Sequence, residues 1–389
     1  MLKITNGKVI TDSIQETNVY VDKGMIVAVT DEELPCDQVL DAQGMYVSPG
    51  FIDIHLHGGG GADFMDGGVE PILTAARTHL KHGTTTLFPT TITAPTETVI
   101  KFFDDIRQAG KEPDMPHIGG VHMEGPYIAD SQAGAQDRRY ITDPKEEDYK
   151  AIVEAGKGLL KRWAFAPERP GSEEFCRYIM ENGIIPAIGH SDATYDDIMK
   201  VYDLGVRDMT HFYSGMSGLT RRDGFRIMGA IETGYLLDDM NVEVITDGLH
   251  LPPNFLKLIY KGKGPDRICL ITDSMRGVDM PEGDSFIGIL GSGVPCIIEG
   301  GIAKMPDRTC FAGSIATTDR LVRTYRDQAG VDLVHCIQMM TRNPARNMGL
   351  EHVGELKAGF DADIVLFDED IQVKTILLKT GEDVKIYNN

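Results

Sequence analysis

The sequence predicts an α/β protein, a (β/α)8 TIM barrel with a small β-sandwich domain that is built from both termini. Two observations point to the barrel: short apolar, β-rich runs alternate with segments of helical periodicity, and there are eight such runs in the 389-residue chain. Eight strands alternating with helices are typical of this barrel. A doubly wound open sheet alternates in the same way, so the sequence leaves that alternative open.

Both ends of the chain are expected to be β structure. KITNGKVIT contains Asn6-Gly7, the commonest two-residue hairpin signal, and NVYVDKGMIVAVT has two apolar runs around Lys23-Gly24. The C-terminal segments DADIVLFDED, VKTILLKTG and EDVKIYNN have the same pattern. Neither end has enough strands to bury a core alone. We therefore expect residues 1–50 and 346–389 to form one composite β-sandwich domain, and residues 51–345 to form the barrel.

Between the ends, strand-like and helix-like segments follow one another. VIKFFDDI has apolar residues at i, i+3, i+4 and i+7 and is closed by Gly110, and PILTAARTHLKHG has the same periodicity and stops at Gly83. These patterns predict helices that follow strands. The eight β-rich runs are FIDIHLHG, TTTLFPTT, IGGVHMEGP, KRWAFAPE, GIIPAIGHS, RDMTHFYSG, VEVITDG and RICLITDS.

Composition excludes several classes of function. The formal net charge is -21, which repels nucleic acid and anionic membranes. The six cysteines are widely spaced without a CxxC pair, so we expect reduced thiols rather than a disulfide framework. The first residues lack a signal-peptide pattern, and no run of 18 apolar residues predicts a membrane span. We expect a cytoplasmic protein whose partner is a small molecule.

Polar residues stand at the C-terminal ends of most of the eight runs. In a barrel these ends converge on one mouth, where the active sites of this fold lie. Side chains that are far apart in the sequence are therefore expected to face one small volume. They are His55, His57, Glu124, His190, His211, Asp247 and Asp273.

Five of these residues are candidate metal ligands. His55 and His57 occupy i and i+2 of a strand, so both imidazoles point to the same side and suit a zinc-type divalent ion. Glu124, His190 and His211 offer a carboxylate and two imidazoles, a catalytic zinc set that leaves a position open. The alternative is that they make structural hydrogen bonds within the core. His122, deeper in its strand, is assigned to packing around the site.

Asp273 ends the eighth run and is the candidate catalytic residue. It is expected to act as a general base toward the attacking water and then to return the proton to the leaving amine. Its alternative role is a helix N-cap. His250 is a candidate contact to substrate hydroxyls or the developing oxyanion. The adjacent Arg221 and Arg222 are usually a solvated pair, but in so acidic a protein they are also candidate phosphate donors.

The motifs, taken in order, resemble the N-acetylglucosamine-6-phosphate deacetylases of the amidohydrolase superfamily. The resemblance covers essentially the whole chain. Its segments are PGFIDIHLHGGGG, HMEGPYI, AIGHSDAT, THFYSGM, ITDGLHLPP, LITDSM, FAGSIAT and NPARNMGLEHVGELKAGFDADIVLFD. HxH and the C-terminal segment are shared across the superfamily, whereas HMEGPYI together with GHSDAT is specific to the deacetylases.

The resemblance implies a function and a set of site residues. Glu124, His190 and His211 would hold the principal divalent metal (zinc, or iron, manganese or cobalt), and Asp273 would be the acid–base residue. His55 and His57 would permit a second ion, with Glu124 bridging. Arg222 would bind the phosphate, in the partner subunit's site of a homodimer. The remaining substrate-binding residues would be Ala135, Gln136, Ser214, Gly215, His250, Phe311, Ala312 and Gly313.

The sequence departs from the family pattern where substrate contacts are expected. Ser214-Gly215 replaces the usual Asn-Ala, Arg222-Asp223-Gly224-Phe225 replaces Arg-Glu-Pro-Gly, and Gln136 stands where some relatives carry histidine. Alternatives therefore stay open: an N-acetylgalactosamine-6-phosphate deacetylase, a deaminase or cyclic amidase on the same scaffold, or a non-catalytic sensor of sugar phosphates.

Overall fold

All eight predicted runs contain strands. The computed structural model describes residues 1–389. The strands are β6 (Phe51–Leu56), β9 (Thr84–Pro89), β10 (His117–Ile118) with β11 (Val121–Glu124), β12 (Leu160–Phe165), β13 (Ile185–Ile188), β14 (Asp208–Met209), β17 (Asn241–Val244) and β18 (Ile268–Leu270).

These strands pair in parallel and in chain order. One sheet has the order β11–β12–β13–β14–β17–β18 and another has β10–β9–β6. Thr90 forms a parallel bridge with His122, and the Asp273 N–H donates to the His55 carbonyl at 2.9 Å, so the two sheets approach at both edges. A doubly wound sheet would reverse its strand order near the middle. This order has no reversal, which gives a parallel half-barrel; closure of the complete ring stays a prediction.

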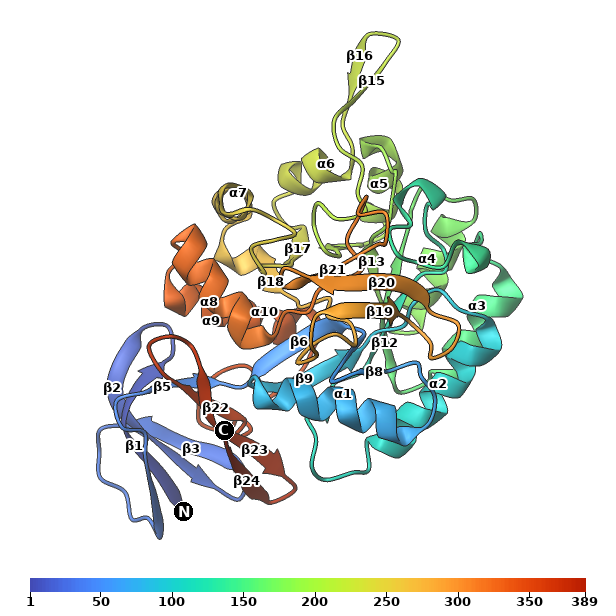
Figure 1. Ribbon diagram of the computed structural model, residues 1–389. Helices are drawn as coiled ribbons and strands as arrows, with labels where there is room; N and C mark the ends of the chain where they lie inside the picture. The colour runs from blue at the N-terminus through green and yellow to red at the C-terminus, as the bar shows by residue number, and fades with distance from the viewer.

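Helices alternate with these strands and cover their outer side (Figure 1). The helices predicted from periodicity are confirmed as α1 (Val69–Lys81) and α2 (Thr96–Ala109). In α2 the apolar stripe is buried against the large core, while Gly110 is the C-cap. The other helices are α3 (Glu146–Ala155), α4 (Ser172–Glu181), α5 (Tyr195–Tyr202), α6 (Ala230–Leu236), α7 (Pro253–Lys263), α8 (Thr318–Ala329), α9 (Leu333–Met340) and α10 (Arg342–Asn347). None of them is long and apolar enough to cross a bilayer.

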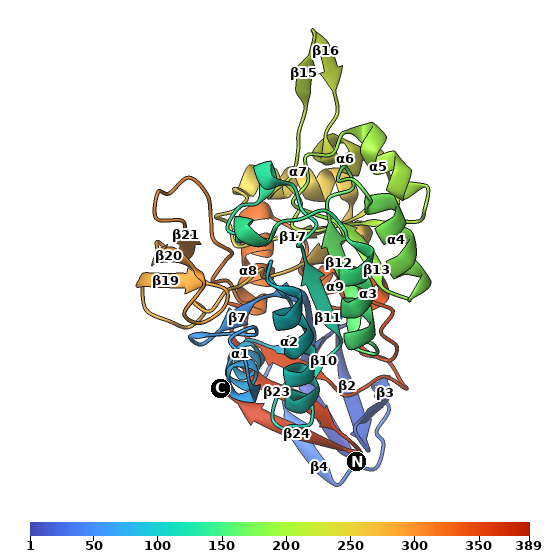
Figure 2. The same ribbon diagram turned by 90° about the vertical axis from the view of Figure 1, so that its right-hand side faces the viewer.

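The two ends of the chain meet in one eight-stranded sheet, seen below the helices in Figures 1 and 2. Strand β22 pairs antiparallel with β5, which joins the C-terminal part to the N-terminal part. A separate apolar cluster, including Ile4, Val47 and Ile364, fills this unit. Its strands are β1 (Leu2–Ile10), β2 (Ile14–Asp22), β3 (Met25–Thr30), β4 (Gln38–Asp41), β5 (Tyr46–Pro49), β22 (Ile364–Phe367), β23 (Val373–Thr380) and β24 (Asp383–Asn388). Its division into the two layers of a sandwich stays a prediction.

The hairpin predicted at Asn6-Gly7 is wrong. Strand β1 runs through both residues, and its pairing with β2 shifts register between Ile4 and Gly7. Asn6 has φ 55°, and a Cβ on Gly7 would lie 2.5 Å from a methyl group of Val47. The Asn-Gly pair therefore forms a bulge that lets β1 pack closely, rather than a turn. The turn predicted at Lys23-Gly24 is present, with both residues at positive φ between β2 and β3.

Several small strands lie outside the two main units. β15 (Thr220–Arg222) and β16 (Phe225–Ile227) form a hairpin that projects far from the body of the molecule (Figures 1 and 2). β19 (Gly283–Ile287), β20 (Val294–Glu299) and β21 (Ile302–Lys304) form a three-stranded antiparallel sheet beside the parallel strands. β7 (Gly58–Gly59) and β8 (Ala62–Asp63) form a short pair after β6.

Candidate active site

The candidate ligands all lie at or just beyond the C-terminal ends of parallel strands. His55 belongs to β6, Glu124 is the last residue of β11, and His190 and His211 follow β13 and β14 by two residues. His190, His211 and Asp273 have positive φ values of 47°, 28° and 47°. For non-glycine residues this conformation costs about 1–3 kcal/mol and persists only where the surroundings enforce it, commonly at functional sites.

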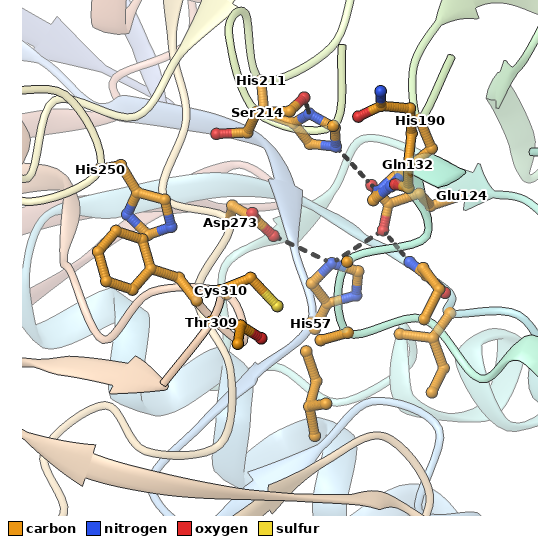
Figure 3. A pocket seen from close by; sticks show the side chains of 18 of the residues that line it. His57, Glu124, Gln132, His190, His211, Ser214, His250, Asp273, Thr309 and Cys310 are labelled. Atoms are coloured by element: carbon orange, nitrogen blue, oxygen red, sulfur yellow. Dashed lines mark hydrogen bonds and ion pairs between the residues drawn. The ribbon is translucent and has the colours of Figure 1, made fainter. Parts of the chain in front are cut away.

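Glu124 lies at the centre of the site (Figure 3). Its Oε1 is 2.8 Å from His211 Nε2 and 3.1 Å from His190 Nε2. On the other side, His55 Nε2 lies 3.4 Å from Oε1 and His57 Nε2 lies 3.4 Å from Oε2. One carboxylate therefore connects two pairs of imidazoles, as the sequence-based hypothesis of a bridging glutamate requires.

The contacts made by the Nδ1 atoms of the imidazoles orient their Nε2 atoms toward Glu124. His190 Nδ1 donates to the Gln132 carbonyl at 2.7 Å, and His211 Nδ1 donates to the Ser214 carbonyl at 3.0 Å. His55 Nδ1 lies 3.1 Å from Glu243, while its buried Nε2 has no hydrogen-bond partner. A carbonyl can only accept, so Nδ1 of His190 and His211 carries a proton. In the neutral ring the lone pair that a metal ion needs is then on Nε2, the atom that faces Glu124.

This donor set fits one or two divalent cations. The candidate ligand atoms of His55, His57 and Glu124 lie within 4.8 Å of one another, as do those of Glu124, His190 and His211. Imidazole nitrogen and carboxylate oxygen are the ligands that zinc and similar ions prefer. The orphaned Nε2 of His55 is a further sign, because a buried polar atom without a partner is costly.

Electrostatics favour ionised carboxylates beside these imidazoles. Burial opposes ionisation of Glu124, but His55, His190 and His211 hold its pKa well below the usual range. Burial likewise opposes ionisation of Asp273, and the hydrogen bond and charge of His57 lower its pKa. Burial lowers the pKa of His57, but Asp273 and Glu124 outweigh it and raise the value to about 9. The site therefore has a strong affinity for positive charge.

Asp273 is placed for proton transfer. Its Oδ1 lies 3.2 Å from His57 Nε2 and 3.7 Å from His55 Nε2, and its side chain is 15% exposed, toward the cavity. Its backbone is fixed on both sides, because Asp273 N–H donates to His55 and its carbonyl accepts from Ser314 at 2.8 Å. Asp247 instead accepts from His250 Nδ1 at 2.8 Å and orients that imidazole.

A cavity of about 560 Å³ opens over these residues. This is within the usual size for a small-molecule site. Of the predicted site residues, His55 and Ala312 lie buried beneath the surface, and Arg222 lies away on the hairpin. The predicted residues that line the cavity are His57, Glu124, Ala135, Gln136, His190, His211, Ser214, Gly215, His250, Asp273, Phe311 and Gly313.

Gly215 and Gln136 have local roles beyond lining the cavity. A Cβ on Gly215, which has φ 56°, would lie 3.0 Å from His190 Nδ1, so only glycine leaves this ligand undisturbed. Gln136 Nε2 donates to Glu124 Oε2 at 2.6 Å, and its Oε1 accepts from the Thr93 N–H at 2.7 Å. In this structure Gln136 therefore holds the candidate ligand Glu124, whereas the resemblance implied a contact with substrate.

Sequence reasoning missed a buried ion network beneath the ligands. Glu243 on β17 lies beside His55 and pairs with Arg162 on β12 at 2.9 Å, and Arg162 also contacts Asp208. The signal was available, because a Glu and an Arg inside apolar runs must be paired when they are buried. His122 lies edge-on to His55 at 4.6 Å between ring centres, and neither of its nitrogens is hydrogen-bonded; its assignment to packing stays a prediction.

Sequence reasoning also missed several residues of the cavity wall. They come from the segments after β9, β11 and β21 and from the end of β19, at positions that the choice of polar strand-end residues did not include. For the residues after β11 and β21, the available signal was their proximity in sequence to Glu124 and to the FAGSIAT segment. The missed residues are Ile92, Ser131, Gln132, Gly134, Arg138, Ile287, Arg308, Thr309 and Cys310.

Comparisons with known proteins agree with this geometry. The amidohydrolase family model matches residues 46–388. The chain is 34% identical to an N-acetylglucosamine-6-phosphate deacetylase of Lysinibacillus sphaericus, covering 92% of this chain and 90% of the relative. It is 28% identical to an N-acetylgalactosamine-6-phosphate deacetylase of Escherichia coli O157:H7, covering 94% of both chains.

Solved structures give the same grouping. The N-acetylglucosamine-6-phosphate deacetylase of Pasteurella multocida superposes with a TM-score of 0.91 at 26% identity over 100% of both chains. The Mycobacterium smegmatis deacetylase, an aspartate-to-alanine mutant in complex with N-acetyl-D-glucosamine-6-phosphate, gives 0.89 at 28% identity over 98% of both chains. The chain thus belongs to the amidohydrolase family and, within it, groups with the N-acetylglucosamine-6-phosphate deacetylases.

Proposed function

We propose that this chain hydrolyses N-acetylglucosamine 6-phosphate to glucosamine 6-phosphate and acetate, in amino-sugar catabolism. The observation that carries the proposal is Glu124, shared by four imidazoles beside Asp273 at the base of one cavity. This set suits hydrolysis of an unreactive amide, which needs both electrophilic activation and a proton for the leaving nitrogen. The relatives named as deacetylases support the acetyl group and the sugar phosphate as the substrate class.

One or two divalent ions, of zinc, iron, manganese or cobalt, belong to this proposal. Glu124, His190 and His211 would hold the first, and His55 and His57, with Glu124, would hold a second. When bound, such an ion supplies Lewis-acid polarisation of the acetyl carbonyl and makes water easier to deprotonate. Gln136 and Glu243 would keep Glu124 and His55 in place through the hydrogen bonds described above.

The proton is moved by Asp273. Its ionised carboxylate takes a proton from the attacking water as the water oxygen bonds to the acetyl carbon. The same carboxyl then gives that proton to the nitrogen as the carbon–nitrogen bond breaks, so the amine leaves neutral. The low pKa that His57 gives Asp273 keeps it ready as a base.

Other residues of the cavity wall would position the sugar. His250, whose Nδ1 donates to Asp247, would present Nε2 to the sugar. The neutral ring would accept a hydrogen bond from a hydroxyl there, and the protonated ring would donate one to the developing oxyanion. Phe311, which packs against His250 with 4.8 Å between ring centres, offers an apolar face. Ala135, Ser214, Gly215, Ala312 and Gly313 would shape the wall and offer backbone groups to the ring.

We also propose a homodimer in which Arg222 reaches the partner's cavity. Arg222 is exposed on the β15–β16 hairpin and forms no ion pair with a carboxylate of its own chain. Phe225 on the same hairpin is 75% exposed and Leu219 beside it is 56% exposed. Large apolar side chains on a projecting arm are typical of a surface that a partner covers.

All six cysteines are free, which supports the expected cytoplasmic location.

The proposal also includes the architecture around this site. We infer that the eight strand positions close into a complete barrel spanning residues 51–345. The terminal sheet, from residues 1–50 and 346–389, would fold over itself as a β-sandwich domain. The hydrogen bonds from Asp273 to His55 and the bridge from Thr90 to His122 support closure.

A substrate panel tests the proposal. The metal-loaded protein would be given N-acetylglucosamine and N-acetylgalactosamine, each with and without a 6-phosphate, and scored for free amine. We expect the highest kcat/KM on N-acetylglucosamine 6-phosphate. A preference for the galactosamine compound would assign the chain to the second sugar, which is the activity of some relatives. No amine from any of the four would exclude the deacetylase.

The same panel tests Arg222. Replacing Arg222 by alanine is expected to raise KM for the phosphorylated sugar by about ten- to a hundred-fold, the worth of one charge-assisted hydrogen bond. The free sugar should be affected little. If Arg222→Ala, alone and combined with Arg221→Ala, treats both sugars as the wild type does, the hairpin does not bind phosphate.

A further inference from the structure

The cavity contains cationic side chains that belong to its own chain. Among its lining residues the carboxylates are Glu124 and Asp273, both committed to the metal-ligand cluster, and the arginines are Arg138 and Arg308. No lysine lines it. In a protein of net charge -21, a substrate phosphate entering this cavity needs such local cations.

The two arginines differ in whether a carboxylate of the chain already pairs with them. Arg308 makes a two-point contact with Glu299, at 2.9 and 3.2 Å. Arg138 forms no ion pair with any carboxylate of the chain, and its single hydrogen bond goes from Nη1 to the Asp130 carbonyl at 2.5 Å. A guanidinium has five N–H donors, so most of those on Arg138 remain free and its charge is uncompensated.

Arg138 lies close in sequence to the residues around Glu124 and lines the same cavity, which makes it available to the phosphate end of a sugar phosphate. Gln136 is fixed on the ligand Glu124 at 2.6 Å, and Arg138 follows two residues later at the start of a short 3-10 helix, Arg138–Tyr140. Two trans peptide units carry its Cα at most about 7.6 Å from that of Gln136. In a hexosamine 6-phosphate the acetamido group and the phosphate lie on different sides of the ring. A cation on the wall of the same cavity, beside the candidate ligands but not among them, is therefore available to the phosphate when the amide lies at the cluster.

From these observations we propose that Arg138 is a specificity-determining residue that binds the substrate phosphate from within the same subunit. This inference rests on the proposed deacetylase function and adds a cation to the site independently of the partner's hairpin. The planar guanidinium gives two parallel N–H donors to phosphate oxygens, a geometry that a lysine lacks. Arg308, already held by Glu299, would contribute less.

The test compares three variants on phosphorylated and free N-acetylglucosamine. Arg138→Ala removes the side chain, while Arg138→Gln keeps a donor for the Asp130 carbonyl and removes only the charge. Arg139→Ala is the matched control, because Arg139 is the neighbouring arginine, pairs with Asp137 and does not line the cavity. Inhibition by inorganic phosphate, with the free sugar as substrate, gives a binding readout that needs no phosphorylated substrate.

We expect both Arg138 variants to raise KM for the phosphorylated sugar and the inhibition constant of phosphate by about ten- to a hundred-fold. Their kcat on the phosphorylated sugar and their kinetics on the free sugar should change much less, and Arg139→Ala should behave as the wild type. Unchanged KM and inhibition constants in both variants would overturn the proposal, as would an equal loss on both sugars, which indicates a structural role. Failure of the deacetylase proposal itself is distinguishable, because the wild type would then release no amine from either sugar.

Discussion

Asp273 is the residue on which turnover is expected to depend most. Replacing it by asparagine keeps size and fold but removes the group that accepts and returns the proton. We expect the rate to fall by about 10²–10⁴-fold while the bound metal is retained. Steady-state kinetics with metal analysis measure both effects, and Asp279→Asn, which alters a surface partner of His82, is the control. A near-normal rate in Asp273→Asn would move the acid–base role to another residue.

The ligand residues are not equivalent in their contribution to metal retention. His190 and Glu124 belong to the set predicted to hold the principal ion, whereas His57 belongs to the second set. We expect His190→Ala to lose nearly all metal and His57→Ala to keep at least one ion per chain. Elemental analysis of the purified variants checks this, with His82→Ala as the histidine control outside the cavity. Full metal content in His190→Ala would refute the assignment.

At the scale of single residues, strand-end position was enough to predict that the histidines and Glu124 lie together, while their role as metal ligands stays a prediction. The C-terminal ends of parallel strands meet at one edge, regardless of the conformation of the loops. This makes predictable the positions of His55, Glu124, His190 and His211. Arg138 and the contact between Gln136 and Glu124 depend on the path of a loop, which has no periodicity to reveal it. A charge within an apolar run predicts that Glu243 and Arg162 each have a partner of opposite charge. The sequence does not show that they are partners of each other.

At the scale of elements, the β15–β16 hairpin is the part on which the proposed homodimer depends most directly. Phe225→Glu places a charge on a side chain that is 75% exposed in the single chain. If a partner covers it, this change loses apolar burial worth about 1.5–3 kcal/mol and adds a desolvated charge. We expect the mass in solution, measured by light scattering, to fall from dimer to monomer.

A matched control makes that result specific. Val39 on β4 is 61% exposed on the terminal sheet, so Val39→Glu tests whether any new surface charge has the same effect. We expect Val39→Glu to stay dimeric. A wild-type protein that is monomeric at every concentration would remove the proposed route by which Arg222 reaches a neighbouring cavity.

Elements were predicted correctly where periodicity and a stop signal coincide, as in α2 with its terminal Gly110. The prediction of a hairpin at Asn6-Gly7 was wrong because an Asn-Gly pair is favoured both in tight turns and in bulges. Both a tight turn and a bulge need positive φ and a missing Cβ, and only the pairing of β1 with β5 decides between them. That pairing involves residues about 40 positions apart, beyond the reach of a local pattern.

At the scale of the whole molecule, the terminal sheet ties both ends of the chain together. Ile364 on β22 is fully buried in its apolar cluster, next to β5. Ile364→Ala is expected to lower the free energy of unfolding by about 2–5 kcal/mol, because it leaves a cavity between the N- and C-terminal strands. Denaturant unfolding measures this. Ile386→Ala, at a 38% exposed position of the same sheet, should change stability by about 0.5 kcal/mol or less.

The net charge of -21 means that an anionic sugar phosphate must be attracted by local cations of the cavity. The central claim is hydrolysis of the acetyl amide of such a sugar. The most direct measurement is the products of N-acetylglucosamine 6-phosphate with metal-loaded protein. The account predicts acetate and primary amine in equal amounts, no ammonia, and loss of both products in Asp273→Asn. Ammonia without acetate, or bound substrate that is never turned over, would contradict it and favour a deaminase or a sensor instead.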